Sequence, residues 1–253
     1  MILVRSLIFT TLAYITMILA AVLCSPALLV SRRLCVEAVR LWVRITRFNL
    51  RYITGIKTEF RGLEHLPDGP FIWASKHQSM YDALAPWLVL DHPAIIIKKE
   101  LLWYPFFGWY AWRTDMISID RSGGAKTLKN MIAASAKSMK GNRQLMIFPE
   151  GTRQKPGAKP FYRPGIFGLY HALDLPVVPV ATNNGLCWPA RGIRRTPGTI
   201  VIEVLPPIET GLEKNAFMKR LETDIETASE ALLEEGLAEQ GRTRADIGLA
   251  TPS

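Results

Sequence analysis

The feature that most constrains the fold is a long stretch near the amino terminus, residues 6–31, in which no side chain carries a charge. About 20 apolar residues are enough for a helix to cross the hydrocarbon core of a bilayer. Ser25 and Pro26 interrupt the stretch, so a re-entrant or hairpin insertion is an alternative to a straight span. A cleaved signal peptide is disfavoured because its small-residue cleavage pattern is weak here. Residues 1–54 are therefore expected to form a membrane-inserting helix or helical hairpin.

Arginines follow this stretch and continue into the next expected helix. Arg32 and Arg33 close the apolar run. At 100° per residue, four further arginines fall within about 60° of one another, opposite apolar and aromatic side chains; they are Arg40, Arg44, Arg47 and Arg51. Such a helix lies at a membrane interface with its arginines toward phosphate head groups, or it presents a solvated face while packed on a domain. If residues 6–31 span, the arginines place the rest of the chain in the cytoplasm.

The net charge of +9 and the hydrophobic content of 49% restrict the partners of the protein. Nucleic acid would account for the charge alone, whereas a membrane with acidic lipids accounts for both. We therefore expect membrane lipids as partners and no nucleic acid. Three scattered cysteines predict neither a disulfide framework nor a metal site, which is typical of chemistry that faces a reducing cytoplasm.

After Gly55, short apolar runs alternate with segments of helical periodicity. The runs are rich in β-branched and aromatic residues and predict strands; they cover residues 71–74, 94–97, 116–119, 145–148, 177–182 and 199–205. Helices are predicted over residues 125–140, 166–173 and 217–232. This alternation predicts an α/β fold over residues 55–240, a mixed, largely parallel sheet flanked by helices. The tail, residues 241–253, lacks a pattern and is expected to be mobile.

A histidine and an aspartate, His77 and Asp82, follow the first of these strands. An imidazole can accept a proton at neutral pH, and a carboxylate on its other nitrogen fixes the tautomer and stabilises the imidazolium. On one regular helix the two side chains would lie about 140° apart and could not meet. The pair works only if His77 stands at the strand exit and Asp82 lies in a helix that begins around Ser79. The alternative is a capped helix with two unrelated polar residues.

Two further strand ends carry residues that suit a phosphate. In an α/β sheet, ligands gather beyond the carboxyl ends of strands. After one strand come Gly151, which permits close backbone approach, Thr152 with its hydroxyl, and the guanidinium of Arg153. After another come Arg121 and two glycines before a helix, whose amino end favours an anion. Together these segments predict a phosphate pocket.

Four blocks of the sequence resemble, in order and approximate spacing, those of the glycerolipid acyltransferase family. The blocks are His77-x4-Asp82, Ile-Asp-Arg at 119–121, Phe-Pro-Glu-Gly-Thr-Arg at 148–153 and Val-Pro-Val at 178–180. The resemblance covers about residues 63–207, and four ordered blocks are far more specific than any one of them.

The resemblance implies an acyltransferase in which the histidine matching His77 deprotonates a glycerol hydroxyl that attacks an acyl thioester directly, while Asp82 orients it. It implies transfer of a fatty acyl group from acyl-CoA or acyl-carrier protein to the sn-2 hydroxyl of 1-acyl-sn-glycerol-3-phosphate, lysophosphatidic acid. The product is phosphatidic acid, made in phospholipid biosynthesis at the inner membrane by a domain that faces the cytoplasm. Neither a metal nor another cofactor is expected.

The resemblance also implies roles for the other block residues. The residues matching Lys98, Arg121, Glu150 and Arg153 bind or shape the acceptor's phosphate site, together with Gly151 and Thr152. The block Val178, Pro179 and Val180 is associated with the acyl-donor side. The donors that would steady a tetrahedral oxyanion are not readable, but backbone amides near the histidine turn are candidates.

Some features leave alternatives open. Lys76 stands where many family members have asparagine, and Asp115 and Ser118 replace a common glycine and aromatic residue, which unsettles the acceptor preference. Another lysolipid, such as lyso-ornithine lipid or a lysophospholipid, is the alternative acceptor. A non-catalytic membrane-binding module and a metal hydrolase are alternatives of other classes. The aromatic cluster in residues 103–112 lines the acyl path, seats the domain at the membrane interface, or is plain core.

Overall fold

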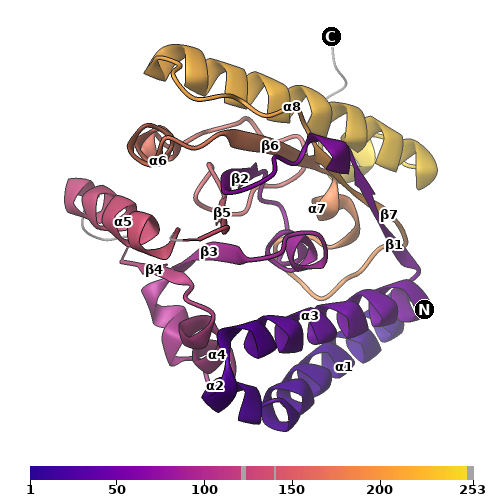
Figure 1. The fold of residues 1–253 in the computed structure, drawn as a ribbon. Helices are drawn as coiled ribbons and strands as arrows, with labels where there is room; N and C mark the ends of the chain where they lie inside the picture. The colour runs from indigo at the N-terminus through magenta and orange to yellow at the C-terminus, as the bar shows by residue number, and fades with distance from the viewer. Residues whose placement is uncertain (121–123, 140, 250–253) are drawn as a thin grey trace.

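The computed structural model describes residues 1–120, 124–139 and 141–249. It places one sheet between two helical layers, with the amino-terminal helices on one side and the carboxyl-terminal helix α8 on the other (Figure 1). The sheet has the strand order β1-β7-β6-β2-β5-β3-β4. Its strands are β1 (Ile56–Arg61), β2 (Phe71–Ser75), β3 (Pro93–Lys98), β4 (Ile117–Ile119), β5 (Gln144–Ile147), β6 (Val177–Thr182) and β7 (Gly198–Val204).

All neighbouring strands pair in parallel except β6 and β7, which are antiparallel. The expected mixed, largely parallel sheet is confirmed. The five strands from β2 to β6 therefore end at a common edge, which is where an α/β sheet collects ligands.

The central strand β2 shows why the sheet is buried on both faces. Phe71 and Trp73 pack into one hydrophobic core, and Ile72 and Ala74 pack into a second core on the opposite face. Side chains alternate across a strand, so a strand covered on both faces reads as a continuous apolar run.

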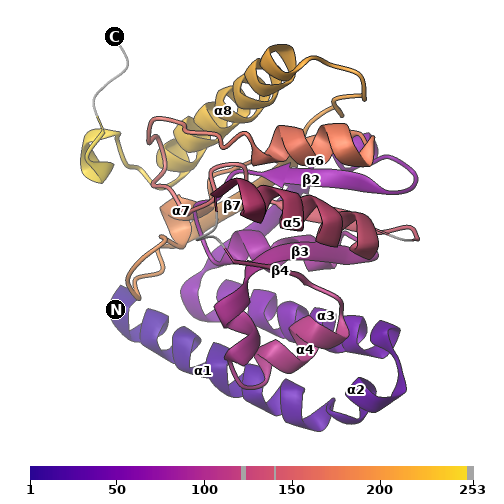
Figure 2. The ribbon, with the colours of Figure 1, turned by 90° about the vertical axis from the view of Figure 1, so that its left-hand side faces the viewer.

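Helices from different parts of the chain cover the two faces (Figure 2). The second core receives side chains from α5 (Gly124–Ser138), α6 (Gly165–Leu173) and α8 (Lys214–Glu239). The first core receives side chains from α1 (Ile2–Leu23), α3 (Arg32–Asn49), α4 (Phe107–Arg113) and the short helix α7 (Asn184–Cys187).

The amino-terminal segment forms a helical hairpin against the sheet layer. Helices α1 and α3 lie side by side in opposite directions, joined by the short helix α2 (Pro26–Val30) (Figure 1). A π-helical turn, η1 (Leu50–Thr54), leads from α3 into β1. Among the described residues, α1 alone is long and apolar enough to cross a membrane by length and composition, with a hydropathy of 2.2. Its outward side is apolar and exposed, including Leu3, Leu7, Ile15, Leu19 and Leu23.

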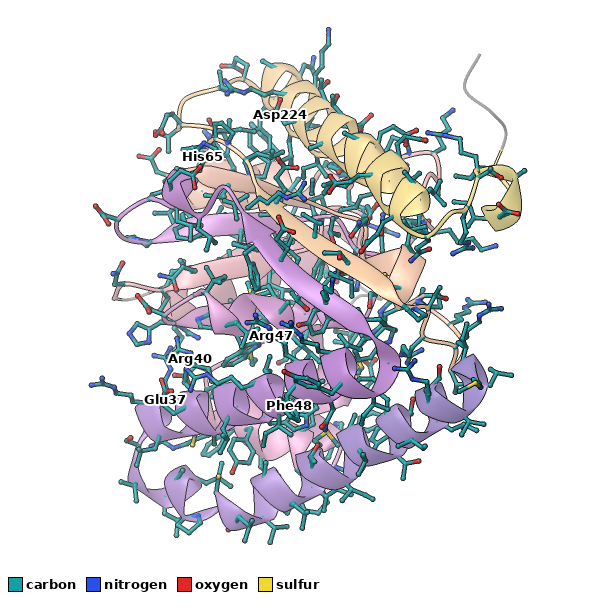
Figure 3. The ribbon with its side chains drawn as sticks, turned by 90° about the vertical axis from the view of Figure 1, so that its right-hand side faces the viewer. Glu37, Arg40, Arg47, Phe48, His65 and Asp224 are labelled. Carbon is teal, nitrogen blue, oxygen red and sulfur yellow. The ribbon has the colours of Figure 1, made fainter. Side chains whose placement is uncertain are left out.

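The arginine stripe on α3 faces the sheet side of that helix. Figure 3 shows Arg40 and Arg47 on the side toward β1. Arg40 donates hydrogen bonds to the backbone oxygens of Trp87, Leu90 and Asp91. This arginine therefore fastens α3 to the domain, while Arg44, Arg47 and Arg51 remain exposed.

Two local features differ from the sequence interpretation. Strand β1 was not expected, although Ile56, Thr58 and Phe60 alternate with charged residues in the manner of a strand. The helix expected around Ser79 consists of two one-turn 3-10 helices, η3 (Tyr81–Ala83) and η4 (Ala85–Leu88).

The tail expected to be mobile continues to pack against the domain up to residue 249. It contains a 3-10 turn, η6 (Ala245–Ile247), and the side chains of Ile247 and Leu249 contact the first core. Residues 250–253 lie outside the described residues.

Candidate active site

The candidate base lies just beyond the carboxyl end of β2. This strand ends at Ser75, and His77 follows in a loop that leads into η3. The Nδ1 atom of His77 lies 3.0 Å from Oδ2 of Asp82. The strand exit turns the imidazole back toward the 3-10 turn, so the two side chains meet as the spacing argument required.

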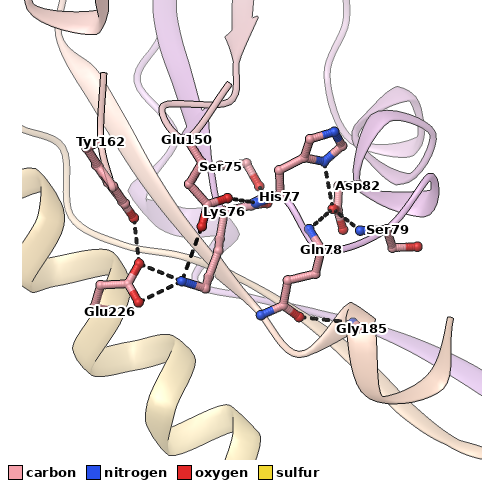
Figure 4. A network of polar contacts seen from close by, with 10 residues as sticks. All are labelled: Ser75, Lys76, His77, Gln78, Ser79, Asp82, Glu150, Tyr162, Gly185 and Glu226. Carbon is pink, nitrogen blue, oxygen red and sulfur yellow. Dashed lines mark hydrogen bonds and ion pairs between the residues drawn. The ribbon is translucent and has the colours of Figure 1, made fainter. Parts of the chain in front are cut away.

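Asp82 is held by several donors besides the imidazole. Its Oδ2 atom accepts hydrogen bonds from the backbone amides of Gln78, at 2.6 Å, and Ser79, at 2.7 Å. Its Oδ1 atom accepts one from the side-chain amide of Asn184. The carboxylate is buried, and with Nδ1 turned to it the Nε2 atom of His77 lies on the far side of the ring (Figure 4). This arrangement presents Nε2 to a substrate.

The imidazole of His77 is also fixed by the loop after β5. Its ring stacks on Phe148 with centroids 3.9 Å apart and an interplanar angle of 13°. The backbone oxygen of His77 accepts a hydrogen bond from the amide of Gln154 at 2.7 Å. Only 14% of the His77 side chain is exposed, so ring orientation is set before a substrate arrives.

Glu150 supports the same histidine from behind. Its Oε2 atom accepts a hydrogen bond from the backbone amide of His77 at 2.8 Å, and the residue is almost fully buried. Burial raises the pKa of Glu150 to about 7, against the opposing effects of the Lys76 ammonium and the His77 amide. Glu150 thus acts on the backbone of the base and not on a phosphate directly.

The amides of the histidine turn are already used by carboxylates. The amide of His77 donates to Glu150, and those of Gln78 and Ser79 donate to Asp82. These three amides are therefore not available as the oxyanion donors for which the turn was a candidate source.

The glycine–threonine–arginine segment forms an open loop beside the base. Gly151 has a φ of 70°, a left-handed conformation that favours glycine. Thr152 and Arg153 are exposed. The loop therefore leaves a hydroxyl and a guanidinium accessible to an anion.

The other expected phosphate ligands lie at the edge formed by β3 and β4. Lys98 ends β3, is exposed, and pairs in register with Ile119, the last residue of β4. Arg121, two positions beyond Ile119, lies outside the described residues.

Two residues near the site were missed in the sequence. A Cβ atom on Gly151 would lie 2.7 Å from Nε of Arg163, so the guanidinium of Arg163 lies over this glycine. Asn184, which binds Asp82, follows β6 in an Asn-Asn-Gly turn. An amide-rich turn at a strand end is a usable signal for Asn184, whereas nothing in the sequence singles out Arg163.

The Val-Pro-Val block lies within the central sheet. Val178 and Val180 are fully buried in the first core, and Pro179 lies beside Ala74 of β2. The backbone oxygen of Val180 accepts a hydrogen bond from the amide of Lys76 at 3.0 Å. This block therefore supports the strand that carries the base.

An apolar cavity of ≈ 520 Å³ extends from the active-site loops toward the amino-terminal hairpin. Met80 and Arg153 line it near the base, and Ala13 and Met17 of α1 line it within the hairpin. Its volume falls within the range of small-molecule sites, which is about 300–1,000 Å³. The cavity has the size and apolar lining that suit a hydrocarbon chain.

The aromatic cluster divides between this cavity and the surface. Tyr104, Phe106, Phe107 and Tyr110 line the cavity. Trp103, Trp109 and Trp112 are exposed, at 84%, 50% and 73% respectively. The interpretation as plain core therefore fails for the tryptophans. The hydroxyl of Tyr110 donates to the backbone oxygen of Ala21, which joins this region to the hairpin.

The metal-hydrolase alternative requires a cluster of ligands. Within the part of the chain that the structure describes, no group of three histidine, cysteine, aspartate or glutamate side chains could hold a metal ion. The described residues thus offer no ligand set for that alternative.

A pre-oriented imidazole–carboxylate pair, an exposed arginine and an apolar cavity together are features that suit general-base chemistry on an amphiphilic substrate. The family model described as Acyltransferase matches residues 57–183. The chain belongs to this acyltransferase family and is an enzyme of acyl transfer.

Curated relatives carry names of one kind. The chain is 32% identical over 215 residues to the 1-acyl-sn-glycerol-3-phosphate acyltransferase of Pseudomonas aeruginosa, a match that covers 85% of this chain and 82% of the relative. It is 31% identical to the human 1-acyl-sn-glycerol-3-phosphate acyltransferase alpha, over 66% of this chain and 60% of that protein.

The fold is also that of a solved structure. The 1-acyl-sn-glycerophosphate acyltransferase from Thermotoga maritima matches with a TM-score of 0.77 at 20% identity, covering 91% of this chain and 95% of that one. The match covers most of this chain and confirms the expected fold.

Proposed function

We propose that the protein transfers a fatty acyl group from an acyl thioester to the sn-2 hydroxyl of 1-acyl-sn-glycerol-3-phosphate and so forms phosphatidic acid. The observation that carries the proposal is the position of Arg153, which lines the apolar cavity and directly precedes Gln154, whose amide donates to the backbone oxygen of His77. A lipid with an anionic head and a hydrocarbon tail fits that combination. The printed names of the relatives support the same acceptor.

The geometry supports direct transfer with His77 as general base. Nε2 takes the proton of the acceptor hydroxyl as its oxygen bonds to the thioester carbonyl carbon. The C–S bond then breaks, and the proton on Nε2 passes to the leaving thiolate. Asp82, hydrogen-bonded to Nδ1, stabilises the imidazolium that exists between these steps. These steps use no metal and no cofactor besides the acyl-CoA or acyl-carrier protein cosubstrate.

The acceptor's phosphate binds at the rim of the site. Arg153 and Thr152 offer donors from the loop after β5, and Arg163 adds a second guanidinium over Gly151. From the family resemblance, Lys98 and Arg121 complete the pocket from the β3–β4 edge. The cavity takes a hydrocarbon chain, with its far end against α1.

The surface that contacts the membrane is inferred from the exposed apolar side chains. Leu7 and Leu19 of α1 are exposed, as are Trp103 and Trp112, and patches of exposed apolar side chains mark membrane or protein contacts. We place this surface in the cytoplasmic leaflet of the inner membrane, with the catalytic domain in the cytoplasm and the arginines of α3 at head-group level. Flotation with vesicles, or its failure, tests this placement.

A panel of acceptors tests the chemical assignment. Purified protein in vesicles, given one acyl thioester, is offered lysophosphatidic acid, lysophospholipids with larger head groups and lyso-ornithine lipid. The highest kcat/KM is expected for lysophosphatidic acid, since clustered guanidinium groups favour a phosphate monoester. A higher value for another lysolipid would reassign the acceptor. Absence of transfer to every acceptor would remove the enzymatic proposal and favour the membrane-binding module.

A further inference from the structure

A buried lysine stands immediately before the base. Lys76 is 2% exposed, and its side chain points away from the substrate side, toward helix α8 (Figure 4). Its ammonium lies 2.6 Å from both carboxylate oxygens of Glu226 on α8 and 3.5 Å from Oε1 of Glu150. One cation thus stands between two carboxylates from distant parts of the chain.

The two carboxylates have different surroundings. Glu226 receives both contacts from Lys76 and a hydrogen bond from the hydroxyl of Tyr162 at 2.9 Å. Among the described residues, Glu150 accepts a hydrogen bond from the amide of His77 on Oε2, whereas its Oε1 atom has no hydrogen-bond partner and lies 3.5 Å from the Lys76 ammonium. Glu226 therefore competes with Glu150 for the Lys76 ammonium and makes the closer contacts with it.

Stability alone does not account for such a group. A buried ion pair loses hydration that its attraction often fails to recover, so an apolar replacement of equal volume is frequently as stable. The network instead connects α8 to Glu150, which accepts the hydrogen bond of the His77 amide. The contacts that make this connection depend on the charge of each group.

We propose that Lys76 and Glu226 form a positioning pair that sets the charge of Glu150 and, through it, the orientation and basicity of His77 in acyl transfer. Glu226 touches no substrate and acts only through Lys76 and Glu150. An ionised Glu150 accepts a stronger hydrogen bond from the His77 backbone and adds negative potential behind the imidazolium.

The ionisation of Glu150 supports this assignment. Its pKa of about 7 results from burial, which raises it, from Lys76 and the His77 amide, which lower it, and from Glu226, which raises it. Tyr162 and, more distantly, Glu222 face the same network from the other side. At neutral pH a change in either member of the pair therefore changes the protonated fraction of Glu150.

The two ends of the pair make opposite predictions. Lys76→Met removes the cation that lowers the Glu150 pKa, so the acid limb of kcat/KM is expected to move to higher pH, by about 1 unit. Glu226→Gln removes the repelling carboxylate and leaves Lys76 to Glu150, so that limb is expected to move to lower pH. A purely structural pair would lower stability in both variants without shifting the limb in opposite directions. The acid limb reports the combined titration of several coupled groups. Each substitution shifts the pKa of all these groups in the same direction.

The experiment rests on the acyltransferase activity and is arranged to fail separately from it. Profiles of kcat/KM against pH are measured for the wild type, both variants, the double variant Lys76→Met/Glu226→Gln and the control Glu213→Gln, which makes the same change of charge at an exposed position at the start of the same helix. Infrared spectra of each protein are also recorded, and the spectrum of the same protein carrying Glu150→Gln is subtracted. The difference reports the protonated Glu150 carboxyl without any turnover.

The results separate the possibilities. Opposite shifts in the single variants, in both the kinetic and infrared titrations, with no shift in Glu213→Gln, establish the positioning pair. Shifts of the same sign, or unshifted titrations in folded variants, overturn it. A wild type without acyl transfer overturns the proposed function alone, because the infrared titration still tests the network.

Discussion

The turn that carries His77 and the loop that we propose binds the phosphate are built in opposite ways, although both follow parallel strands of one sheet. Around His77, the Asp82 carboxylate has four donors, the imidazole is stacked, and the backbone is bonded on both sides. In the loop after β5, Thr152 and Arg153 stand exposed. Proton transfer needs groups fixed in advance, whereas a phosphate that must enter and leave needs donors that are still available. Losses in the turn should therefore appear in kcat, and losses in the loop should appear in KM.

The largest expected effect comes from the base itself. His77→Ala removes the proton acceptor, and general-base groups contribute about 10²–10⁴-fold. We expect kcat to fall by about 10³-fold or more, with unchanged vesicle binding and acceptor KM, as measured by acyl transfer to lysophosphatidic acid. His171→Ala, an exposed histidine on α6, serves as the matched control and should retain full activity. Substantial turnover by His77→Ala would show that the turn that carries His77 does not supply the catalytic base.

The second effect concerns stability and its dependence on pH. The folded pKa of Glu150, about 7, lies above its ordinary value of 4.5. The folded state therefore binds the proton more tightly, so this contribution to stability is complete below about pH 4.5 and is lost as the pH rises through 7. Glu150→Gln keeps a hydrogen-bond acceptor for the His77 amide and cannot ionise.

Unfolding by denaturant across the pH range measures this difference. Relative to wild type, Glu150→Gln should gain stability between pH 5 and 8, by up to about 3 kcal/mol. A difference that stays constant over this range would mean that Glu150 does not change its charge there, and the buried turn would then be fixed independently of pH.

A smaller effect is expected in the open loop. Arg153→Ala removes a charge-assisted contact, worth about 1.5–3 kcal/mol, and the acceptor KM should rise by about 10–100-fold. The KM of the acyl donor, kcat and thermal stability should change little, since the side chain is exposed. Arg191→Ala, an exposed arginine in another loop, is the control. Equal increases in both KM values would contradict the assignment of Arg153 to the phosphate.

The same contrast explains what could be read from the sequence. His77 and Asp82 are five positions apart, so local chain geometry showed how they could meet, and the three further motif blocks favoured that meeting over two unrelated polar residues. The strands were readable because buried parallel strands are continuous apolar runs. Lys76 and Glu226 lie 150 positions apart and meet only because α8 packs across the sheet. Arg163 likewise reaches the site through tertiary packing that no local pattern encodes, and the turn that marks Asn184 does not reveal that its partner is Asp82. Strand β1 was missed because its alternation of apolar and charged residues is short.

The smallest effect tests whether exposed side chains outside the active site are also available for binding, in this case to the membrane. Trp103 and Trp112 are among the most exposed side chains, and the fold does not need them to be aromatic. If they lie in the bilayer interface, as aromatic residues often do, Trp103→Ser/Trp112→Ser should weaken partition into acidic vesicles about tenfold. The melting temperature, and turnover of detergent-dispersed acceptor, should stay unchanged. Leu63→Ser, a partly exposed residue of the globular domain, is the control. Unaltered partition would leave the hairpin as the sole membrane contact, whereas a lowered melting temperature would mean that these tryptophans stabilise the fold.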